Sequence, residues 1–366
     1  MIKKLLVKLT PYDRYFFGGN NTFGEGDSVN YFVKSKYFPQ QTSLLGLVRY
    51  QLMVQNNNGA FIKNKIVDPA KAAELINHKS FDINDREFSF GKIKELSPVF
   101  IAGENEEYLF PANREYQWDN EEKKYVLREF KILENSNSKI YQSQKFIPYL
   151  GNYIAKEDLP DLLISTDKDL YNYSKVFLEH KQVGIRKNYI GKTDEKAFYV
   201  QFFYKLEKGC SFAFILHLED DIKFYSSELV TLGGEQSKFR MEVEETKNEF
   251  EALLPAYQGS KESHKIVLIS DAYVSNKIFD NCDFAITDTI EFNSIKSTVN
   301  TTKYSSMDRI GNKGDELSKS GQYNFFKKGS VFYSQNISKI TRYLDEKDSL
   351  KKIGYNHYKI VNKREE

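Results

Sequence analysis

One stretch of the chain combines glycines, lysines and a helix start in a pattern suited to binding an anion. No acidic residue occurs between Ser28 and Val67. A loop rich in glycine and asparagine precedes a predicted helix, and glycine lets the backbone approach a phosphate closely. The free N–H groups and the positive dipole end of that helix face whatever precedes it. The residues predicted to bind phosphate here are Gly18, Gly19, Asn20, Lys34, Lys36, Gln41, Thr42, Ser43 and Arg49.

A second glycine-containing loop offers a similar arrangement later in the chain. Two adjacent glycines permit positive φ and a run of N–H groups that form an anion-binding nest. The spacing is not that of a Walker loop, so nucleotide hydrolysis is not indicated. The alternative interpretation is a plain hairpin turn, just as the alternative for the first stretch is a solvated basic face beside an ordinary N-cap. The candidates in this loop are Gly233, Gly234, Gln236, Ser237, Lys238 and Arg240.

The remaining reactive side chains show no catalytic or metal-binding pattern. None of the five histidines lies at metal-ligand spacing from another histidine or from a cysteine, so neither a metal nor a cofactor is predicted. The widely separated Cys210 and Cys282 are interpreted as reduced thiols. Asp27, inside the first glycine-rich loop, is the one acid with catalytic potential, although a turn-forming role is the stronger interpretation. The sequence therefore predicts binding rather than catalysis.

Aromatic residues make up 15% of the chain, with 25 Tyr and 28 Phe. Single-stranded RNA is commonly bound by stacking its bases on exposed aromatic side chains, at about 1–3 kcal/mol per base. Tyr15, Phe16, Phe17 and Phe23 flank the first glycines and are predicted to be such stacking residues. Most other aromatic residues alternate along predicted strands and are expected in the core.

The overall charge does not decide the type of partner. Lys and Arg (53) nearly balance Asp and Glu (51), giving a net charge of +2 over 366 residues, a length typical of about two domains. The N-terminal apolar run is interrupted by Lys8 and stopped by Pro11, which is too short for a signal peptide. No run of about 18 apolar residues is present. A cytoplasmic protein that spans no membrane is expected.

The element pattern favours an α+β fold, because strands and short helices mix without strict alternation. Alternating apolar residues predict a strand over 4–10. A helix of about 13 residues is expected from Thr42 or Ser43, its predicted N-cap, and Gly46 inside it suggests close packing against its backbone. The other predictions are hairpins over 94–110 and 198–218, buried strands at 266–269 and 331–333, and a long loop over 294–320.

Several segments, in this order, resemble one family. They are YFFGGNNTFGEGDSVNYFVKSKYFPQQTSLLGLVRYQL, VGIRKNYIGKTDEKAFYVQFFYKL, LVTLGGEQSKFRMEV and FFKKGSVFY, followed by GYNHYKI. The chain is similar in these segments to the RAMP superfamily, and in particular to the third subunit of the type III-B CRISPR Cmr effector complex. The segments 56–137 and 294–320 depart from the family pattern.

The resemblance implies two tandem ferredoxin-like (RRM-like) modules with long insertions. The first would span residues 1–178 with an insertion at about 56–137, and the second residues 179–366 with the glycine-rich loop and the long loop. It further implies a non-catalytic RNA-binding subunit that holds the 5′ tag of a guide RNA. The implied protein partners are the large polymerase-like Cmr subunit and the backbone RAMP subunits.

Two rival functions stay open at this point. One is a RAMP-type metal-independent endoribonuclease that processes guide RNA through a histidine acting in general acid–base chemistry. Such enzymes resemble this family but carry the histidine near the first helix, whereas the first histidine of this chain is His78. The other is the corresponding subunit of another CRISPR class.

Overall fold

The computed structural model describes residues 1–18, 32–56, 59–85, 89–127, 146–149, 152–155, 161–187, 193–259, 264–300 and 318–363. Gly19, Asn20, Phe23 and Asp27, which carry predictions made above, lie outside these ranges. Within them the fold mixes many strands with few helices. No helix in the described ranges is long and apolar enough to cross a membrane.

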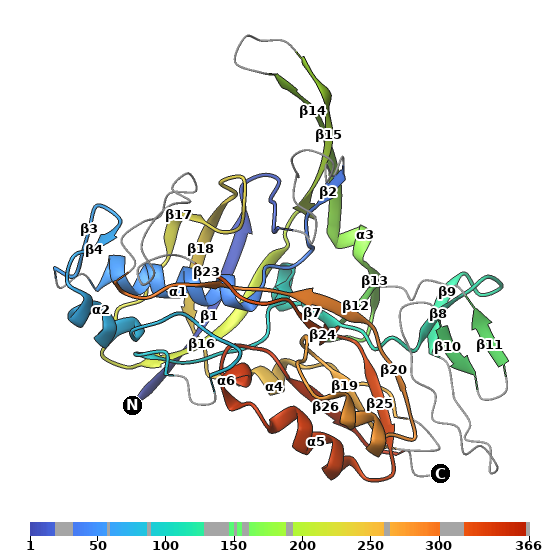
Figure 1. Cartoon of the computed structure of the whole chain (residues 1–366). Coiled ribbons are helices and arrows are strands. Elements are labelled where there is room, and N and C mark those ends of the chain that lie inside the picture. The colour runs from blue at the N-terminus through green and yellow to red at the C-terminus, as the bar shows by residue number, and fades with distance from the viewer. Residues whose placement is uncertain are drawn as a thin grey trace.

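A nine-stranded sheet forms the centre of the molecule around β1 (Figure 1). The predicted strand is confirmed, and its alternation buries Leu5, Val7 and Leu9. β1 lies between β16 and β18, which come from the other half of the sequence, so the sheet takes strands from both sides of residue 178. Its strands are β1 (Ile2–Pro11), β5 (Ile93–Leu96), β6 (Phe100–Ala102), β7 (Tyr108–Pro111), β12 (Leu162–Ser165), β13 (Leu170–Asn172), β16 (Ser211–Glu219), β17 (Ser227–Thr231) and β18 (Lys238–Glu245).

The predicted hairpin over 198–218 is wrong, although its turn exists. The N–H of Cys210 donates to the carbonyl of Glu207 at 3.0 Å, but the two strands then separate. β15 (Thr193–Leu206) pairs with β14 (Phe177–Lys187) and β2 (Phe32–Lys34), and this ribbon projects from the body in Figure 1. β16 pairs instead with β1, because its apolar face completes the central core.

The hairpin predicted over 94–110 is confirmed in part. β6 pairs with β7 across a turn that begins at Gly103, whose N–H donates to the carbonyl of Glu107 at 2.8 Å. The first residues of the predicted hairpin form β5, which pairs with β16 instead.

The long helix α1 (Gln41–Gln55) begins earlier than predicted. Its N-cap is Gln40, whose carbonyl accepts hydrogen bonds from the N–H groups of Ser43 and Leu44, so neither Thr42 nor Ser43 is the cap. The close packing expected at Gly46 is also wrong, because a Cβ there would meet nothing within 4 Å. The other helices are α2 (Pro69–Ile76), α3 (Tyr173–Val176), α4 (Phe250–Leu253), α5 (Ile337–Asp345) and α6 (Asp348–Lys351), with 3₁₀ turns at Glu104–Glu106 and Asn276–Asn281.

The C-terminal part contributes a four-stranded sheet ordered β20–β25–β19–β26. The two buried strands predicted at 266–269 and 331–333 are confirmed as β19 and β25, which pair with each other. The predicted loop over 294–320 carries the two-residue strands β22 and β23 near its ends. The strands of this sheet are β19 (His264–Leu268), β20 (Phe284–Ile286), β25 (Val331–Ser334) and β26 (Tyr358–Val361). Two-stranded pairs are β3 (Phe61–Ile62) with β4 (Lys65–Ile66), β8 (Tyr116–Asp119) with β9 (Lys124–Leu127), β10 (Phe146–Tyr149) with β11 (Asn152–Ala155), β21 (Thr289–Phe292) with β24 (Tyr323–Phe326), and β22 (Ile295–Lys296) with β23 (Ser318–Lys319).

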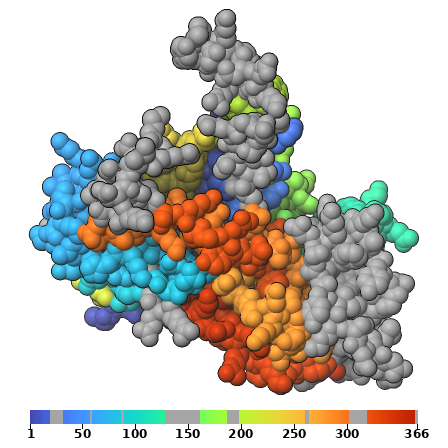
Figure 2. Space-filling model, viewed as in Figure 1, coloured from blue at the N-terminus to red at the C-terminus, as the bar shows by residue number. Residues whose placement is uncertain are grey.

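Buried charges join the C-terminal sheet to the central sheet. The Arg114 guanidinium donates to the carboxylate of Asp288 at 2.8 Å, and both side chains are about 5% exposed (5% and 6%). Lys265 and Glu115, each 1% exposed, form a second such pair at 2.6 Å. Charges removed from water need such partners. On the face that Figure 2 shows, C-terminal residues (orange and red) lie directly against N-terminal residues (blue and cyan).

Candidate nucleic-acid interface

Three segments that the sequence analysis singled out meet at one place. The N–H of Gly234 donates to the carbonyl of Phe16 at 2.8 Å, which joins the glycine turn to the start of the first glycine-rich loop. The N–H of Lys36 donates to the carbonyl of Phe17, also at 2.8 Å. Gly18 follows directly and is exposed. The backbone therefore holds Gly18, Lys36 and the turn at 233–237 side by side, although they are far apart in sequence.

The second glycine loop is the turn of the hairpin formed by β17 and β18. Gly233 has φ +86°, and a Cβ there would lie 2.5 Å from the carbonyl oxygen of Phe16, so only glycine fits. Ser237 is buried, and its hydroxyl accepts from the N–H of Phe16 and donates to the carbonyl of Gly234. Ser237 thus positions the turn, while Gln236 and the side chains of Lys238 and Arg240 face solvent. Arg240 contacts Glu242 at 3.2 Å.

The lysines next to this turn differ in how they are held. Lys34 is exposed and pairs with Glu179 at 2.8 Å, a surface ion pair that contributes little and exchanges readily. The Lys36 ammonium donates to the carbonyl of Glu291 at 3.1 Å. Burial lowers the pKa of Lys36, with an opposing contribution from the carboxylates of Asp271 and Glu291.

The start of α1 follows shortly after Lys36 in the chain. The residues of this helix that were predicted to bind phosphate differ in their exposure and contacts. Gln41 is 4% exposed and its amide donates to the carbonyls of Ser97 and Ile353, so it fastens the helix both to the segment after β5 and to the C-terminal part. Thr42 is half-buried and Ser43 is exposed. Arg49 is also buried, at 8% exposure, so its side chain is poorly accessible to RNA.

The acid-free stretch is not one surface. Its first lysines, Lys34 and Lys36, lie near the glycine turn, whereas Lys63 and Lys65 lie in and beside the β3–β4 hairpin that follows the far end of α1. A helix of this length separates its two ends by about 22 Å. Only the first half of the stretch can therefore join the interface formed with the glycine turn.

The prediction that Tyr15, Phe16 and Phe17 stack on bases is wrong for this structure. All three are buried, at 0%, 8% and 4% exposure. The Tyr15 ring packs edge-on against Phe212, and the Phe17 ring stacks parallel to Phe239. The segment adds to the sheet through bridges to β15 and Gly234, which turns its aromatic rings toward the core.

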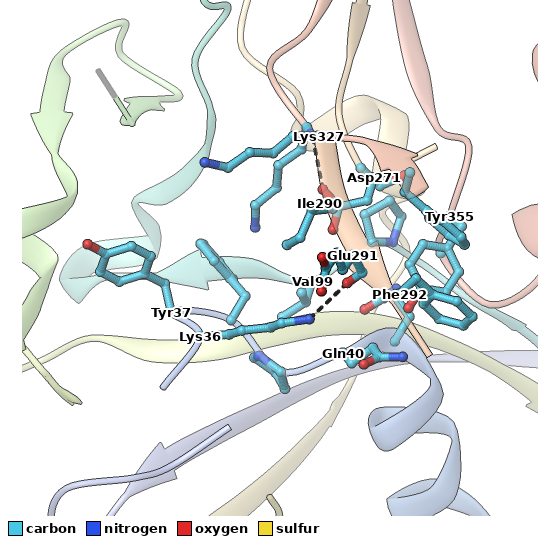
Figure 3. Close-up of a pocket in the computed structure, with 18 of the residues that line it drawn as sticks. Lys36, Tyr37, Gln40, Val99, Asp271, Ile290, Glu291, Phe292, Lys327 and Tyr355 are labelled. Atoms are coloured by element: carbon cyan, nitrogen blue, oxygen red, sulfur yellow. Dashed lines mark hydrogen bonds between the residues drawn. The ribbon is translucent and has the colours of Figure 1, made fainter. Parts of the chain in front are cut away.

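A cavity of about 360 Å³ adjoins Lys36 and was not predicted from the sequence. Figure 3 shows Tyr37 at one end and Phe292 and Tyr355 at the other, with Lys36 reaching between them toward Glu291. Its aromatic residues form two groups, one around Tyr37 and one around Tyr355. The first group is Tyr37, Phe38, Tyr173 and Tyr204, and the second is Phe292, Phe325 and Tyr355.

Ammonium and carboxylate groups line the cavity between the aromatic groups. The Lys328 ammonium lies 3.0 Å from the centroid of the Phe38 ring. Burial lowers the pKa of Lys328 to about 7, with an opposing contribution from Asp271. Lys327 is committed elsewhere, since it contacts Asp161 at 2.8 Å and Asp288 at 3.7 Å.

Three buried polar atoms of the residues that line the cavity form no hydrogen bond of ordinary geometry within the described part of the chain. They are Oε1 of Gln41 and the hydroxyl oxygens of Tyr204 and Tyr355. Burial raises the pKa of Tyr355 above its ordinary range, partly offset by the N–H groups of Gln41 and Thr42 and by the Gln40 side chain. Buried polar groups normally have partners. The Tyr355 hydroxyl has those N–H groups beside it and the Tyr204 hydroxyl has Tyr37 beside it, which leaves Oε1 of Gln41.

The described residues contain no group of three or more His, Cys, Asp and Glu side chains arranged to hold a metal ion. One histidine does lie between carboxylates. Nδ1 of His217 is 3.6 Å from Glu95, and its Nε2 is 3.6 Å from Glu249. Burial lowers the pKa of His217, although Glu249 acts in the opposite direction.

Comparison with known proteins identifies a family that matches this chain. The family described as CRISPR-associated protein (Cas_Cmr3) matches residues 7–363. A chain in the cryo-EM structure of the Type III-B Cmr-beta bound to cognate target RNA is 14% identical, with a TM-score of 0.50 over 97% of this chain and 96% of that one. The structure with AMPPnP (state 1) gives 0.49 at the same identity and coverage. At 14% identity, the likeness to the structure with target RNA alone is evidence for the fold and for nothing further. No curated protein matches.

Proposed function

The chain belongs to the Cas_Cmr3 family, the third subunits of type III-B CRISPR Cmr complexes, and we propose that it holds the 5′ tag of the guide RNA in such a complex. In this role it is a non-catalytic subunit that positions RNA. Its proposed protein partners are the large polymerase-like subunit and the backbone RAMP subunits. The two ferredoxin-like modules and their boundary at residue 178 also stay proposals.

The observation that carries the proposal is the meeting of Gly18, Lys36 and the glycine turn. In the proposal, the RNA passes along the exposed glycine backbone and the side chains of Lys34, Lys36 and Lys238, with Arg240 further along β18. Lysines and backbone N–H groups bind phosphate without reading the base, which suits a subunit that fixes the register of a guide. Gly19 and Asn20, which follow Gly18 directly, extend the same path in the proposal.

In this proposal the residues of α1 do less than the direct phosphate binding predicted from the sequence. These residues are Gln41, Thr42, Ser43 and Arg49. The N–H groups at the start of α1 supply positive potential next to Lys36, while the Gln41 side chain holds the helix in place. The buried Arg49 contributes charge at a distance rather than a direct phosphate contact.

Photo-crosslinking of the assembled complex tests the proposal. A guide that carries 4-thiouridine at single positions is bound, irradiated and mapped by mass spectrometry. We expect the 5′-tag positions to cross-link to peptides that contain residues 15–36 and 227–245. Cross-links from the tag that fall only on peptides around the β3–β4 hairpin or α5 would contradict it.

A further inference from the structure

We propose that the C-terminal end of α1 and the β3–β4 hairpin dock another protein, through a partner face that is apolar at its centre and acidic at its rim. The docking surface, called the α1-end surface below, collects exposed apolar residues from three segments of the chain. They are Tyr50 and Val54 of α1, Ile62 and Val67 in and beside the hairpin, and Tyr225 before β17. The inference rests on the proposed function only in that the partner is a protein of the same complex.

The helix contributes two apolar side chains on the side that faces away from the core. Leu44, Val48 and Leu52 are buried beneath α1. Tyr50 and Val54 are four residues apart and therefore share one face, and they are 39% and 45% exposed. The outer face of a helix that packs on a core is normally polar. At its C-terminal end α1 instead presents an apolar pair to solvent.

The β3–β4 hairpin adds to the same surface, because side chains along a strand alternate between two faces. Phe61 points into the core, whereas Ile62 and Val67 are 52% and 54% exposed. The Tyr50 hydroxyl donates to the side-chain oxygen of Asn64, in the turn of the hairpin, at 2.9 Å. The Tyr50 ring also packs edge-on against Phe61. Helix and hairpin are therefore fixed to each other.

The segment before β17 completes the surface beside the end of α1. The N–H of Tyr225 donates to the side-chain oxygen of Gln55 at 2.7 Å, and the Gln55 amide donates to the carbonyl of Tyr225 at 3.0 Å. Asn56 exchanges the same two hydrogen bonds with the backbone of Lys223, both at 2.8 Å. These contacts hold the 61%-exposed Tyr225 against the helix before any partner binds.

The charge next to these apolar residues is positive. Lys63, Lys65 and Lys223 are exposed, and none of the three has an ion-pair partner within the described part of the chain. Asp68, the next acid along the chain from the hairpin, accepts from the N–H of Lys71 and lies 3.7 Å from its ammonium. Interfaces pair a positive patch with a negative one. The unpaired lysines therefore indicate carboxylates at the rim of the docking protein.

The type of apolar side chain favours a protein over RNA. Bases of RNA stack on flat aromatic rings, whereas Val54, Ile62 and Val67 are aliphatic. Exposed apolar residues that gather inside a charged rim are typical of surfaces that bury apolar side chains of another protein. In Figure 1 the β3–β4 hairpin lies at the outer edge of the molecule, away from the C-terminal sheet. Lys36, where RNA is proposed to bind, precedes the opposite end of α1, and the two ends are about 22 Å apart.

Carbodiimide cross-linking of the assembled complex is the first arm of the test, because this reagent joins an ammonium to a carboxylate that touches it. We expect Lys63, Lys65 or Lys223 to be joined to Asp or Glu residues of one other protein of the complex, identified by mass spectrometry. Lys339, an exposed lysine of α5, is the matched control and should not be joined to that protein. A complex without cross-links from the three lysines to another protein would overturn the inference.

The second arm places a carboxylate at the apolar centre of the surface. Val54→Glu and Ile62→Glu change exposed positions, so the chain should keep its fold and its urea midpoint. We expect the affinity for the cross-linked protein to fall by about tenfold or more, measured by native mass spectrometry over a dilution series. Ile360→Glu, at a 42%-exposed position of β26, is the matched control and should bind that protein as the parent does. Parent affinity in both folded variants would overturn the inference.

RNA binding is the competing outcome, and it is measured separately. Replacing Lys63, Lys65 and Lys223 together with Gln should leave the salt dependence of RNA affinity unchanged. A lower salt dependence in a complex that keeps all its proteins would assign the surface to RNA and overturn the inference. The proposed function has its own readout, since the guide's 5′ tag should cross-link to residues 15–36 and 227–245 in all of these variants.

Discussion

The backbone N–H of Gly234 donates a hydrogen bond to the carbonyl oxygen of Phe16 at 2.8 Å, and this contact is the joint between the two glycine-rich loops. Phe16 lies just before the first glycine-rich loop, and Gly234 lies in the turn between β17 and β18, which is the second loop. Because the N–H of Lys36 is bonded to Phe17, the same joint places the lysines of the 34–36 segment beside the turn. The interface is therefore held by backbone contacts, and the turn that brings Gly234 to Phe16 requires glycine at position 233.

Gly233→Val should break this joint. The residue would need φ +86° and would place Cβ 2.5 Å from the Phe16 carbonyl oxygen, at a strain of about 1–3 kcal/mol. We expect lower stability by about that amount in urea denaturation, and loss of guide RNA from the assembled complex.

Gly46→Ala is the matched control, since its Cβ meets nothing within 4 Å in an exposed helix position. It should raise the stability by about 0.5–1 kcal/mol and leave guide retention unchanged. A Gly233→Val chain that is as stable as the parent and keeps its guide would assign the loop to an ordinary turn.

Asp288→Ala should strongly destabilise the junction between the two sheets. It leaves the buried Arg114 guanidinium with Asp161 as its remaining carboxylate partner, and breaking a buried pair from one side costs about 3–5 kcal/mol. The exposed pair of Lys34 and Glu179 is the comparison, and Glu179→Gln should cost less than about 1 kcal/mol. Equal effects of the two substitutions on the urea midpoint would refute a structural role for the buried pair.

Lys328 should make the stability of the chain depend on pH above neutrality. Its pKa is about 7 in the folded chain against 10.5 ordinarily, so between these values the unfolded state binds more protons. Stability attributable to this residue therefore rises as the pH increases from 7 toward 10.5. The charges facing it are Asp271, Lys327 and Asp161, and they are shared with the Lys328→Met variant.

The measurement is the difference in unfolding free energy between parent and Lys328→Met at pH 7 and at pH 9. We expect the parent to gain on the variant as the pH is raised. A difference that stays constant would show that the Lys328 ammonium is not desolvated.

Local pattern predicted the elements whose burial is set by their own alternation. β1, β19 and β25 were found because apolar residues at strand spacing, or in short apolar runs, leave few other choices. The prediction of a hairpin over 198–218 was wrong because a strand can pair with any segment of the chain. Its first half pairs with β14 and its second half with β1. The N-cap at Thr42 or Ser43 failed because the Gln40 carbonyl already closes the first turn.

The candidate site was predictable only in pieces. Glycines and lysines marked Gly18, Lys36 and the turn, but nothing local shows that they meet. The cavity is harder still, because Tyr37, Tyr173, Phe292 and Tyr355 reach it from four separate segments. The signal available in the sequence was basic and aromatic residues side by side in KSKYF, over 34–38, and in FFKK, over 325–328.

The purified chain should not cleave guide RNA with or without divalent metal ions. The strongest candidate for acid–base chemistry among the described residues is His217 between Glu95 and Glu249, and its lowered pKa keeps it mostly neutral at pH 7. Incubation of labelled RNA with the chain and with His217→Ala, His78→Ala and His180→Ala variants checks this. Metal-independent cleavage that disappears in any of these variants would favour the endoribonuclease reading, and cleavage lost in Asp27→Ala would point to a loop aspartate.

The central claim, that this chain holds guide RNA through its phosphates, is tested most directly by the salt dependence of RNA affinity in the assembled complex. Each phosphate contact contributes about 0.7 to the slope of log K against log salt for a single strand. Replacing Lys34, Lys36 and Lys238 together with Gln should lower that slope by about 2, with little dependence on the tag sequence. The matched control replaces Lys63, Lys65 and Lys339, which lie away from the interface, and should leave the slope as it was. An unchanged slope in the first variant, with the complex intact, would contradict the account.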